Sequence, residues 1–298
     1  QDSMIIVQLS GGLGNQMFQY AAGRGLAMAE HTELALDSSL LTAEPAEGIV
    51  NREFGLGCFR LTPRMASAAE IDRVLYPWGQ GITGEILARM ERWRPHHRRR
   101  LYYFEHAGLF DANFPRAGRN AYLIGYWQSE KYFRGIEREI RQDFSFRDDL
   151  DDLGKERAEQ IRSCKAICLN VRRADFVASR THGVCDVDYF RRAVAVLAER
   201  IGVPRLFIFS DDIEWCQKNL GFECPVTFMT HECAGYNFEQ YLHLMTLCSH
   251  FIIPNSTFGW WAAWLSQNPS KIVVVPRKWF QDISMPTKDI IPEGWLRI

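Results

Sequence analysis

Short apolar runs alternate with helical patterns along most of this chain. The alternation is clearest in the second half, which has strand patterns at residues 165–171, 205–209, 226–228, 251–253 and 271–275 and helical patterns at 188–201, 213–219, 238–248 and 258–266. Strands separated by helices build a parallel sheet, because each connection has to cross the sheet. The sequence therefore predicts an α/β fold with a doubly wound second domain.

The first half begins with the same kind of unit. A strand pattern (4–9), a glycine-rich turn (10–15), a helical pattern (16–30) and a second strand pattern (33–36) follow one another. The middle is less regular, with helical patterns at 66–75, 85–93 and 131–142 and a strand pattern at 121–128. A chain of 298 residues suits two domains. An acidic, linker-like stretch at 148–154 places the boundary, so we predict domains at 1–150 and 151–298.

Composition narrows the class of protein. The net charge is −1, which gives no overall sign of nucleic-acid or membrane binding. No apolar run approaches the roughly 18 residues that span a bilayer. The eight cysteines lack zinc-site spacing and several lie inside apolar patterns, as reduced core thiols do. With Met4 taken as the native start, we expect a cytoplasmic protein.

A basic run with interleaved aromatic residues covers residues 92–100, RWRPHHRRR. Runs of this kind bind RNA in some proteins, but no nucleic-acid-binding module accompanies this one. We favour a solvated loop around Pro95, or a patch that faces an anionic substrate or lipid headgroups. Nucleic acid is therefore not an expected partner, whereas peripheral membrane association stays open.

Four polar clusters lie where a strand pattern passes into a helical pattern. They occupy residues 11–15, 170–175, 210–212 and 255–257. The carboxyl ends of parallel strands share one edge of a sheet, and ligands bind at that edge. Three of the clusters are therefore expected together on the second domain, and the first cluster belongs to the other domain.

Arg172 and Arg173 directly follow the strand pattern at 165–171. Two planar guanidinium groups suit a diphosphate or a carboxylate, because each can give two parallel charge-assisted hydrogen bonds. The alternative is a pair of structural ion pairs, with Asp175 and another carboxylate as partners.

The glycine-rich turn at 11–15 matches neither common phosphate-binding motif. It lacks the Gly-Lys-Ser/Thr of a P-loop, and Met17 stands where a dinucleotide fingerprint needs its last glycine. Its glycines would still let the backbone approach a ligand, and the helix that follows would attract an anion. A plain tight turn is an equal alternative.

Two further polar motifs precede helical patterns. Asn255-Ser256-Thr257 is expected to cap the last helix, and the same hydroxyl groups could hold a phosphate. Asp186-Val187-Asp188 has the form of a metal-and-diphosphate motif, but an N-cap at Asp188 explains it better. Without a metal, Arg172 and Arg173 would supply the positive charge for a leaving diphosphate.

Four motifs together resemble those of bacterial α-1,2-fucosyltransferases (glycosyltransferase family 11), within the GDP-fucose-dependent fucosyltransferases. They are GGLGNQMFQY at 11–20, GYWQSEKYF at 125–133, FSDD at 209–212 and NSTFGWW at 255–261. The stretch NVRRAD at 170–175 resembles the family's His-x-Arg-Arg-x-Asp motif. Asn170 replaces the usual histidine there, and Ala174 stands where glycine is common.

The resemblance implies a GT-B fold, with two Rossmann-like domains facing across a cleft. The N-terminal domain would lie on the acceptor side and the C-terminal domain would bind GDP-fucose. The implied reaction transfers L-fucose, with inversion and without a metal or other cofactor, to the 2-hydroxyl of a galactose-type residue in an O-antigen or oligosaccharide. The alternatives are another linkage or acceptor, a dinucleotide-dependent oxidoreductase, and a non-catalytic sugar- or RNA-binding module.

The resemblance also implies roles for individual residues. Arg172 would bind the β-phosphate and stabilise departing GDP, and Arg173 and Asp175 would position it. Asn170 would lie near the guanine, where it can donate and accept hydrogen bonds but cannot titrate. The other donor contacts would come from Asp211 or Asp212 at the guanine or ribose, from Asn255, Ser256 and Thr257 at the phosphates, and from Gly12, Gly14 and Asn15 over the diphosphate and fucose.

The base that deprotonates the acceptor hydroxyl stays open at this stage. The candidates are Asp175, His182 and, through a water molecule, Asn15. For His182 a surface-loop histidine is an equal alternative, and an oxocarbenium-like reaction would need little help from a base.

Overall fold

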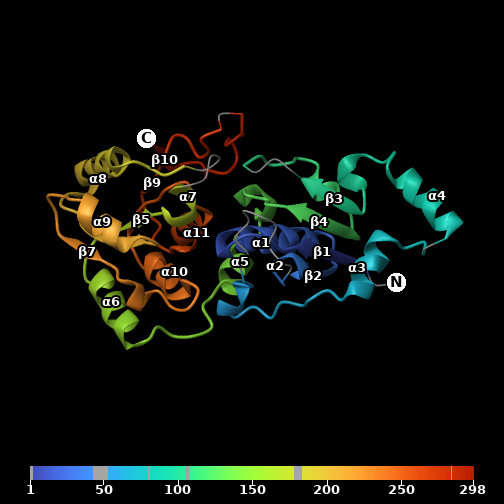
Figure 1. The fold of residues 1–298 in the computed structure, drawn as a ribbon, viewed down its shortest axis with the longest axis horizontal. Helices are drawn as coiled ribbons and strands as arrows, with labels where there is room; N and C mark the ends of the chain where they lie inside the picture. Colours follow the sequence, from blue (N-terminus) through green and yellow to red (C-terminus); the bar gives the residue numbers. More distant parts are fainter. Residues whose placement is uncertain (1–2, 43–52, 80, 105–107, 178–182, 283) are drawn as a thin grey trace. The chain divides into compact units, whose positions relative to one another are not determined.

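The computed structural model describes residues 3–42, 53–79, 81–104, 108–177, 183–282 and 284–298. The chain separates into two structural units: Gln1–Arg147 with Pro286–Pro292, and Asp148–Met285 with Glu293–Ile298. Each unit contains one parallel sheet with helices packed on it (Figure 1). The predicted α/β class is confirmed.

The first unit is built on a four-stranded sheet. Its strands are β1 (Met4–Gln8), β2 (Glu33–Asp37), β3 (Leu101–Phe104) and β4 (Ala121–Gly125), in the order β2-β1-β4-β3. Its helices are α1 (Leu13–Ala29), α2 (Ser39–Thr42), α3 (Ala68–Leu75), α4 (Ile82–Glu91) and α5 (Glu137–Asp143). The 3₁₀ turns are η1 (Leu56–Cys58), η2 (His96–Arg98), η3 (Phe114–Arg116) and η4 (Glu130–Phe133). The winding direction reverses between β1 and β4, because β2 lies on one side of β1 and β4 on the other.

The second unit is built on a six-stranded sheet in the order β10-β9-β8-β5-β6-β7. Its strands are β5 (Ala166–Val171), β6 (Arg205–Ser210), β7 (Val226–Phe228), β8 (His250–Ile252), β9 (Val273–Val275) and β10 (Leu296–Arg297). Its helical elements are α6 (Asp152–Arg162), α7 (Ala174–Val177), α8 (Val187–Ile201), α9 (Ile213–Asn219), η5 (His231–Cys233), α10 (Glu239–Thr246) and α11 (Thr257–Leu265). Here the winding direction reverses between β5 and β8.

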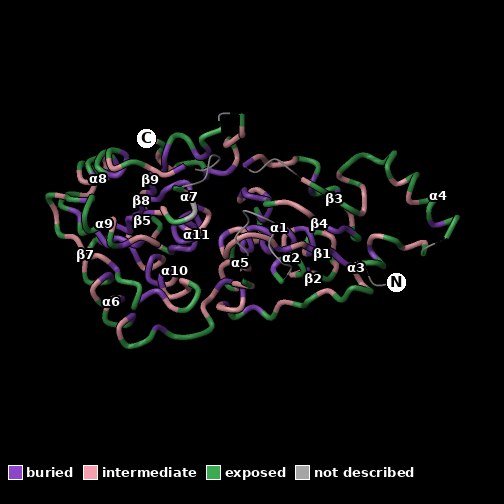
Figure 2. The backbone as a smooth tube through the Cα atoms, in the orientation of Figure 1, coloured by how far each residue is buried: buried purple, intermediate pink, exposed green. Residues whose placement is uncertain are grey.

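The core of the second unit explains why its strands read as continuous apolar runs. All six residues of β5 are buried, because the strand is central and helices cover both faces of the sheet (Figure 2). Phe190, Val194 and Leu197 from α8 pack into the same apolar cluster as Ile167 and Leu169 of β5. The strand is therefore a rigid support for whatever follows Val171.

Three local predictions are wrong. The stretch predicted as a linker at 148–154 contains the start of α6, where Asp151 accepts a hydrogen bond from the Gly154 N–H at 2.7 Å. The helix predicted at 131–142 is interrupted by Gly135 (φ +92°) and divides into η4 and α5. The N-cap of α8 is Asp186, whose side chain accepts from the Tyr189 N–H at 2.6 Å, and Asp188 follows in the first turn.

Two strands were not predicted at all. β3 directly follows the basic run and pairs with β4, and β10 pairs with β9 near the C-terminus. Both are edge strands, and β10 has only two residues. Short edge strands lack the buried pattern that marks central ones, because one of their sides has no neighbouring strand.

Residues Pro286–Pro292 belong to the first unit although they lie inside the predicted second domain. Asp289 accounts for much of this attachment: its carboxylate pairs with the Lys131 ammonium and accepts the Phe110 N–H at 3.0 Å. The Ser129 hydroxyl donates to the Asp289 carbonyl at 2.8 Å. Burial alone would raise the pKa of Asp289, but Lys131 and the Phe110 N–H outweigh it and lower the pKa.

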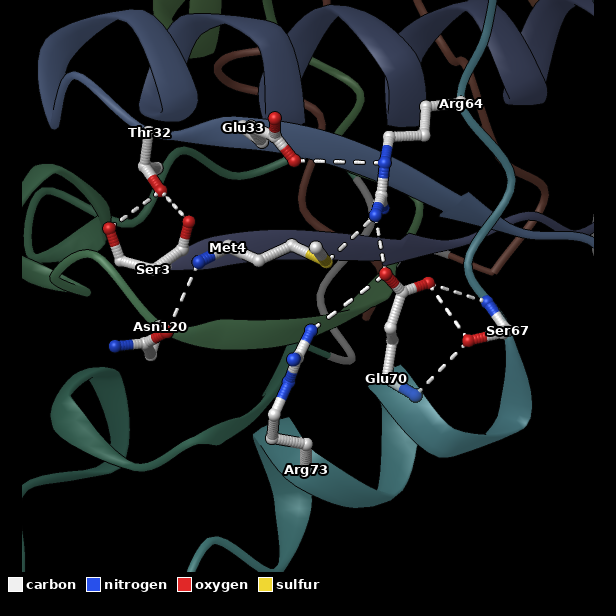
Figure 3. A network of polar contacts seen from close by, with 9 residues as sticks. All are labelled: Ser3, Met4, Thr32, Glu33, Arg64, Ser67, Glu70, Arg73 and Asn120. Atoms are coloured by element: carbon white, nitrogen blue, oxygen red, sulfur yellow. Dashed lines mark hydrogen bonds and ion pairs between the residues drawn. The ribbon is translucent and has the colours of Figure 1, made fainter. Parts of the chain in front are cut away.

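A network of polar contacts joins the start of the first sheet to α3 (Figure 3). Ser67 and Glu70 form a capping box at the N-terminus of α3, and Glu70 also pairs with the Arg64 guanidinium. Arg64 reaches Glu33 at 3.6 Å and the sulfur of Met4 at 3.6 Å. Met4 and Glu33 are the first residues of β1 and β2, so this network lies at the amino edge of the sheet.

Candidate functional site

The strand order of the second unit brings two predicted clusters together. β5 and β8 are neighbours, and the winding direction reverses between them. β5 is followed by Arg172 and Arg173, and β8 leads to residues 255–257. Ligands of open α/β sheets bind outside the carboxyl ends of strands at such a reversal. The cluster at 210–212 ends β6, the neighbour of β5 on the other side, so three clusters share one edge as predicted.

Arg172 is paired with Asp211 across the ends of β5 and β6. Its Nη1 lies 2.9 Å from Asp211 Oδ2, and its guanidinium lies 5.5 Å from the centre of the Phe176 ring. Asp211 Oδ2 nevertheless accepts no hydrogen bond from the described residues, because the N–H bonds of Arg172 are not directed at it. The contact is therefore an ion pair without hydrogen-bond geometry.

Arg173 is held by an aromatic ring, an ion pair and a backbone hydrogen bond. Its guanidinium lies 3.8 Å above the Trp215 ring, and its Nε lies 3.3 Å from Asp212 Oδ2. Its backbone N–H donates to Asp211 Oδ1 at 2.9 Å. Stacking combined with an ion pair fixes the planar group, as arginine allows and lysine does not.

Both carboxylate oxygens of Asp212 have a partner in the protein, although the side chain is 40% exposed. Its Oδ1 caps α9 by accepting the Trp215 N–H at 3.2 Å, and its Oδ2 takes Arg173. Its own N–H donates to the Ser210 hydroxyl at 2.9 Å. Arg173 and Asp212 thus form a structural ion pair, which was the alternative to ligand binding for this arginine.

Asn170 lies at the end of β5 with its side chain buried. Its Nδ2 donates to the Phe209 carbonyl at 3.2 Å, whereas its Oδ1 accepts no hydrogen bond from the described residues. That oxygen faces Gly259 in the first turn of α11, where a Cβ would lie 2.7 Å from it. A buried carbonyl oxygen without a donor carries a desolvation cost, which a ligand N–H could offset.

The cluster at 255–257 lies at the start of α11 as predicted, but the Ser256 hydroxyl does not cap the helix. Ser256 occupies the N-cap position and is buried, yet its side chain makes no capping hydrogen bond. Asn255 is also buried, and its Nδ2 donates to the Trp279 carbonyl at 2.9 Å. The positive end of the α11 dipole thus lies at the reversal point without a side-chain acceptor at its N-cap.

The first unit has a matching reversal point between β1 and β4. The motif at 11–15 follows β1, and the motif at 125–133 begins at the last residue of β4. Asn15 joins them, because its Oδ1 accepts from Gln128 Nε2 at 2.9 Å. Gly12 is the N-cap of α1 and has no side chain that could cap the helix. Gly11 has φ +72°, and a Cβ on Gly11 would lie only 2.6 Å from Asn15 Nδ2.

Sequence reasoning missed the residues that hold this loop. Gln16 and Gln19 are fully buried on α1. Gln16 Nε2 donates to the Gly11 carbonyl at 2.9 Å, and Gln19 Nε2 donates to the Gly125 carbonyl at 3.0 Å. The sequence did contain a signal for these contacts, because Gln16 and Gln19 lie among apolar residues in the helical pattern at 16–30. Buried polar side chains are almost always hydrogen-bonded, so both amides were candidates to hold the loop.

Trp127 and Gln128 also lie at this reversal point. Both side chains are buried, and neither Trp127 Nε1 nor Gln128 Oε1 has a hydrogen-bond partner among the described residues. Trp127 has φ +52°, a conformation that costs energy for a residue with a Cβ and that gathers at functional sites. Unpaired buried polar atoms beside a strained residue mark this edge as a place for a ligand.

A further polar group lies at the same sheet edge and was not predicted. Asp37 ends β2, is buried, and accepts a hydrogen bond from the Tyr122 hydroxyl. Gln8 at the end of β1 donates to that hydroxyl at 3.0 Å. Burial, with the Asp37 hydrogen bond as the next cause, raises the pKa of Tyr122 well above its usual range. The phenol therefore stays protonated and holds the carboxylate in place.

The structure does not describe the side chains of two predicted site residues, Asp175 and His182. Asp175 belongs to the short helix α7, and His182 lies outside the described residues. Among the residues with described side chains, no group of three or more His, Cys, Asp or Glu residues is arranged to hold a metal ion. No helix in the described part of the chain has the length and apolarity needed to cross a membrane.

A cavity of about 530 Å³ lies in the first unit, away from the clusters described above. Ser3, Glu33 and Arg119 line it, and these residues precede or begin β1, β2 and β4. It therefore opens at the amino edge of the sheet. Ligands of such sheets bind at the carboxyl edge, so this cavity is not part of the candidate site.

The chain is similar to known proteins over most of its length. An Escherichia coli protein named alpha-1,2-colitosyltransferase is 30% identical, with 99% of each chain aligned. Human galactoside alpha-(1,2)-fucosyltransferase 1 is 27% identical over 59% of this chain and 52% of its own length. The fucosyltransferase NodZ from Bradyrhizobium, a solved structure, aligns over 96% of this chain and 97% of its own with 16% identity and a TM-score of 0.46.

The family comparison covers about two thirds of the chain. Residues 100–298 match the family described as Glycosyl transferase family 11. The matched region includes the whole reversal point of the second unit and the motif at 125–133. This chain therefore belongs to glycosyl transferase family 11.

Proposed function

We propose that this enzyme transfers L-fucose from GDP-fucose to the 2-hydroxyl of a galactose-type residue, with inversion and without a metal. The observation that carries the proposal is the position of Arg172 at the reversal point of the second unit, where it follows β5, the strand beside the one that leads to α11. The names of the E. coli and human relatives support the α-1,2 linkage. The second unit would bind the donor and the first unit the acceptor.

The chemistry requires stabilisation of a leaving diphosphate. When the bond between fucose and phosphate breaks, positive charge grows on the sugar and negative charge on the β-phosphate. Arg172 is the candidate for this role, since it directly follows β5 at the carboxyl edge of the sheet and a phosphate could offer its guanidinium two parallel bonds. Preorganised donors of this kind contribute about 3–4 kcal/mol each in other enzymes.

The remaining donor-binding roles follow from the contacts in the second unit. Ser256, Thr257 and the first-turn amides of α11 would hold phosphate oxygens, and Asn255 would support the turn. Asn170 Oδ1 would accept a hydrogen bond from the base of the nucleotide. Arg173 and Asp212 would position Arg172 and Asp211 rather than touch the donor, because they are already bound to each other and to α9.

The first unit would supply Gly12, Gly14 and Asn15 toward the sugar and the diphosphate. Gln128 would hold Asn15 in place for that task. For the base we retain Asp175, His182 and, through water, Asn15 as proposals, and variants at each position would separate them.

Incubation with GDP-fucose, lactose and EDTA tests the proposal. We expect release of GDP, and an NMR spectrum of the product with fucose on the 2-hydroxyl of galactose. If none of several galactosides gives a fucosylated product, the proposed reaction is wrong. If a product forms with another linkage, GDP-fucose remains the donor and the 2-hydroxyl of galactose is not the acceptor group.

A second donor follows from one comparison. The E. coli relative aligned over 99% of this chain is named for colitose, the 3-deoxy form of L-fucose. We therefore expect GDP-colitose to compete with GDP-fucose at the same site. The ratio of the two kcat/KM values decides which sugar is the natural donor.

A further inference from the structure

Helix α4 carries an apolar ridge that faces away from the protein. The ridge consists of Ile82, Ile86 and Met90, which are 81%, 55% and 54% exposed, and of Trp93, which is 88% exposed. The helical turn continues past Glu91, because the Trp93 N–H donates to the Met90 carbonyl at 3.0 Å. The four side chains therefore form one continuous stripe.

The opposite face of α4 contains Gly84, which packs against the loop that precedes the helix. Gly84 is buried, and a Cβ there would lie 2.1 Å from the Gly79 carbonyl. At about 100° per residue, Gly84, Ala88 and Glu91 lie roughly 170° around the helix from the centre of the ridge. Figures 1 and 2 show α4 at the periphery of this unit, beyond β3 and α3, with most of its length exposed.

This arrangement reverses the usual one. A helix on the surface of a globular protein normally turns its apolar side chains inward. Here the inward face is made of a glycine, an alanine and a glutamate, and the apolar face meets solvent. Such a face gains free energy when another apolar phase covers it.

Positive charge surrounds the end of the ridge. Residues 82–100 contain six arginines and two glutamates, a net charge of +4 in a chain whose total is −1. Arg92, Arg94 and Arg98 are exposed. Glu91, one of the two acids, is bound to the Arg100 N–H at 2.8 Å and to Arg94 at 3.3 Å.

We propose that α4 and the basic run at 92–100 dock this enzyme on a membrane surface rich in anionic lipid. A helix with an apolar ridge, an adjacent tryptophan and flanking arginines matches the chemistry of an interface in which acyl chains lie below anionic headgroups. An RNA would use the arginines but not the aliphatic ridge. A second copy of the chain would cover the ridge but would bring the same +4 charge against it.

Vesicle flotation tests this proposal with the intact protein. We expect it to bind vesicles of phosphatidylcholine and phosphatidylglycerol, to bind pure phosphatidylcholine much more weakly, and to be released by salt. Equal binding to both vesicle types, or no binding to either, would overturn the proposal.

Two variants separate the ridge from the charge. Ile86→Glu with Met90→Glu should abolish flotation, whereas Val203→Glu, at an 83% exposed valine in the second unit, should not. Arg92→Glu with Arg98→Glu should lower the affinity at least roughly 25-fold, about fivefold for each lost arginine. The paired control is Lys155→Glu with Arg191→Glu, two exposed cations of the second unit.

Three control measurements complete the test. All variants should keep activity on a soluble galactoside, because none alters the candidate site. A wild-type dimer that the ridge variant converts to monomer would assign the ridge to a second copy. Binding of poly-uridylate without binding of anionic vesicles would assign the arginines to nucleic acid. Either of these two results would overturn the membrane proposal.

Discussion

The side-chain oxygen of Asn170 faces the α-carbon of Gly259 so closely that a Cβ on the glycine would lie 2.7 Å from it. Asn170 belongs to β5 and Gly259 to the first turn of α11, so this contact sets how near α11 comes to the sheet at the reversal point. The Nδ2 of the same asparagine donates to Phe209 in β6. One side chain thus connects two strands and the helix that form the candidate site.

Gly259→Ala should therefore destabilise the protein by about 1–3 kcal/mol and weaken GDP binding, because the new Cβ meets Asn170 and Ile253. Denaturant unfolding and calorimetric GDP titration measure the two effects. Gly221→Ala is the control, since nothing lies within 4 Å of a Cβ there. In an Asn170→Ala background the cost should shrink, and equal costs in both backgrounds would contradict the contact.

Arg172→Lys should lower kcat by roughly 10²–10³-fold with little change in stability, because an ammonium cannot form the two parallel bonds to a phosphate. Steady-state kinetics and a thermal melt measure this. Arg191→Lys, at an exposed arginine on α8, should behave as wild type. Near-normal turnover in Arg172→Lys would mean that the arginine serves only its ion pair with Asp211.

Gln128→Met should reduce kcat/KM about tenfold or more, since the variant keeps the shape of the side chain but removes the hydrogen bond to Asn15. The loss of a buried partner costs about 1–3 kcal/mol, which should also appear in the unfolding free energy. Gln217→Met, on the exposed side of α9, is the matched control. Wild-type activity in Gln128→Met would show that Asn15 keeps its position without the amide.

Acid should destabilise the first unit partly through Glu70. The Ser67 N–H, followed by the Arg64 guanidinium, lowers the pKa of Glu70 from 4.5 to about 2. A carboxylate whose pKa is lower when folded stabilises the protein above pH 4.5 and loses that contribution as the pH falls toward 2. Unfolding free energies at pH 6 and pH 3 should therefore differ less in Glu70→Gln than in wild type or in Glu214→Gln, and an unchanged difference would contradict this assignment.

GDP should raise the Tm of the protein, whereas NAD⁺ and NADP⁺ should leave it unchanged at the same concentration. Binding at 100 times the Kd stabilises the folded state by about 2.7 kcal/mol. Arg172→Ala should remove most of the GDP shift. Stabilisation by a dinucleotide and not by GDP would favour the oxidoreductase alternative instead.

Central strands and their polar ends were predictable because burial on both faces leaves a continuous apolar run. Residues 166–171 and 205–210 show this pattern, and each is followed by the charged side chains that now face each other. Edge strand β3 was missed for the same reason, since an edge strand is not buried on both sides. Helix α6 was not predicted, and the N-cap of α8 is Asp186 rather than the predicted Asp188, because either aspartate could cap the helix.

The ion-pair partners of Arg172 and Arg173 could not be predicted from residues nearby in the sequence. Arg172 and Arg173 were expected either on a ligand or in ion pairs with Asp175 and another carboxylate. Asp211 and Asp212 became their partners because β6 lies beside β5 in register, which places the two strand ends together. Trp215 joined them because α9 starts there and turns its ring under Arg173.

The α/β class and the positions of the polar clusters at strand ends were predictable from the sequence, because they depend on local periodicity and on residue type. Which clusters meet depends on the three-dimensional packing of the strands. The strand orders β2-β1-β4-β3 and β10-β9-β8-β5-β6-β7 set the two reversal points, and strand order depends on contacts between segments far apart in the chain.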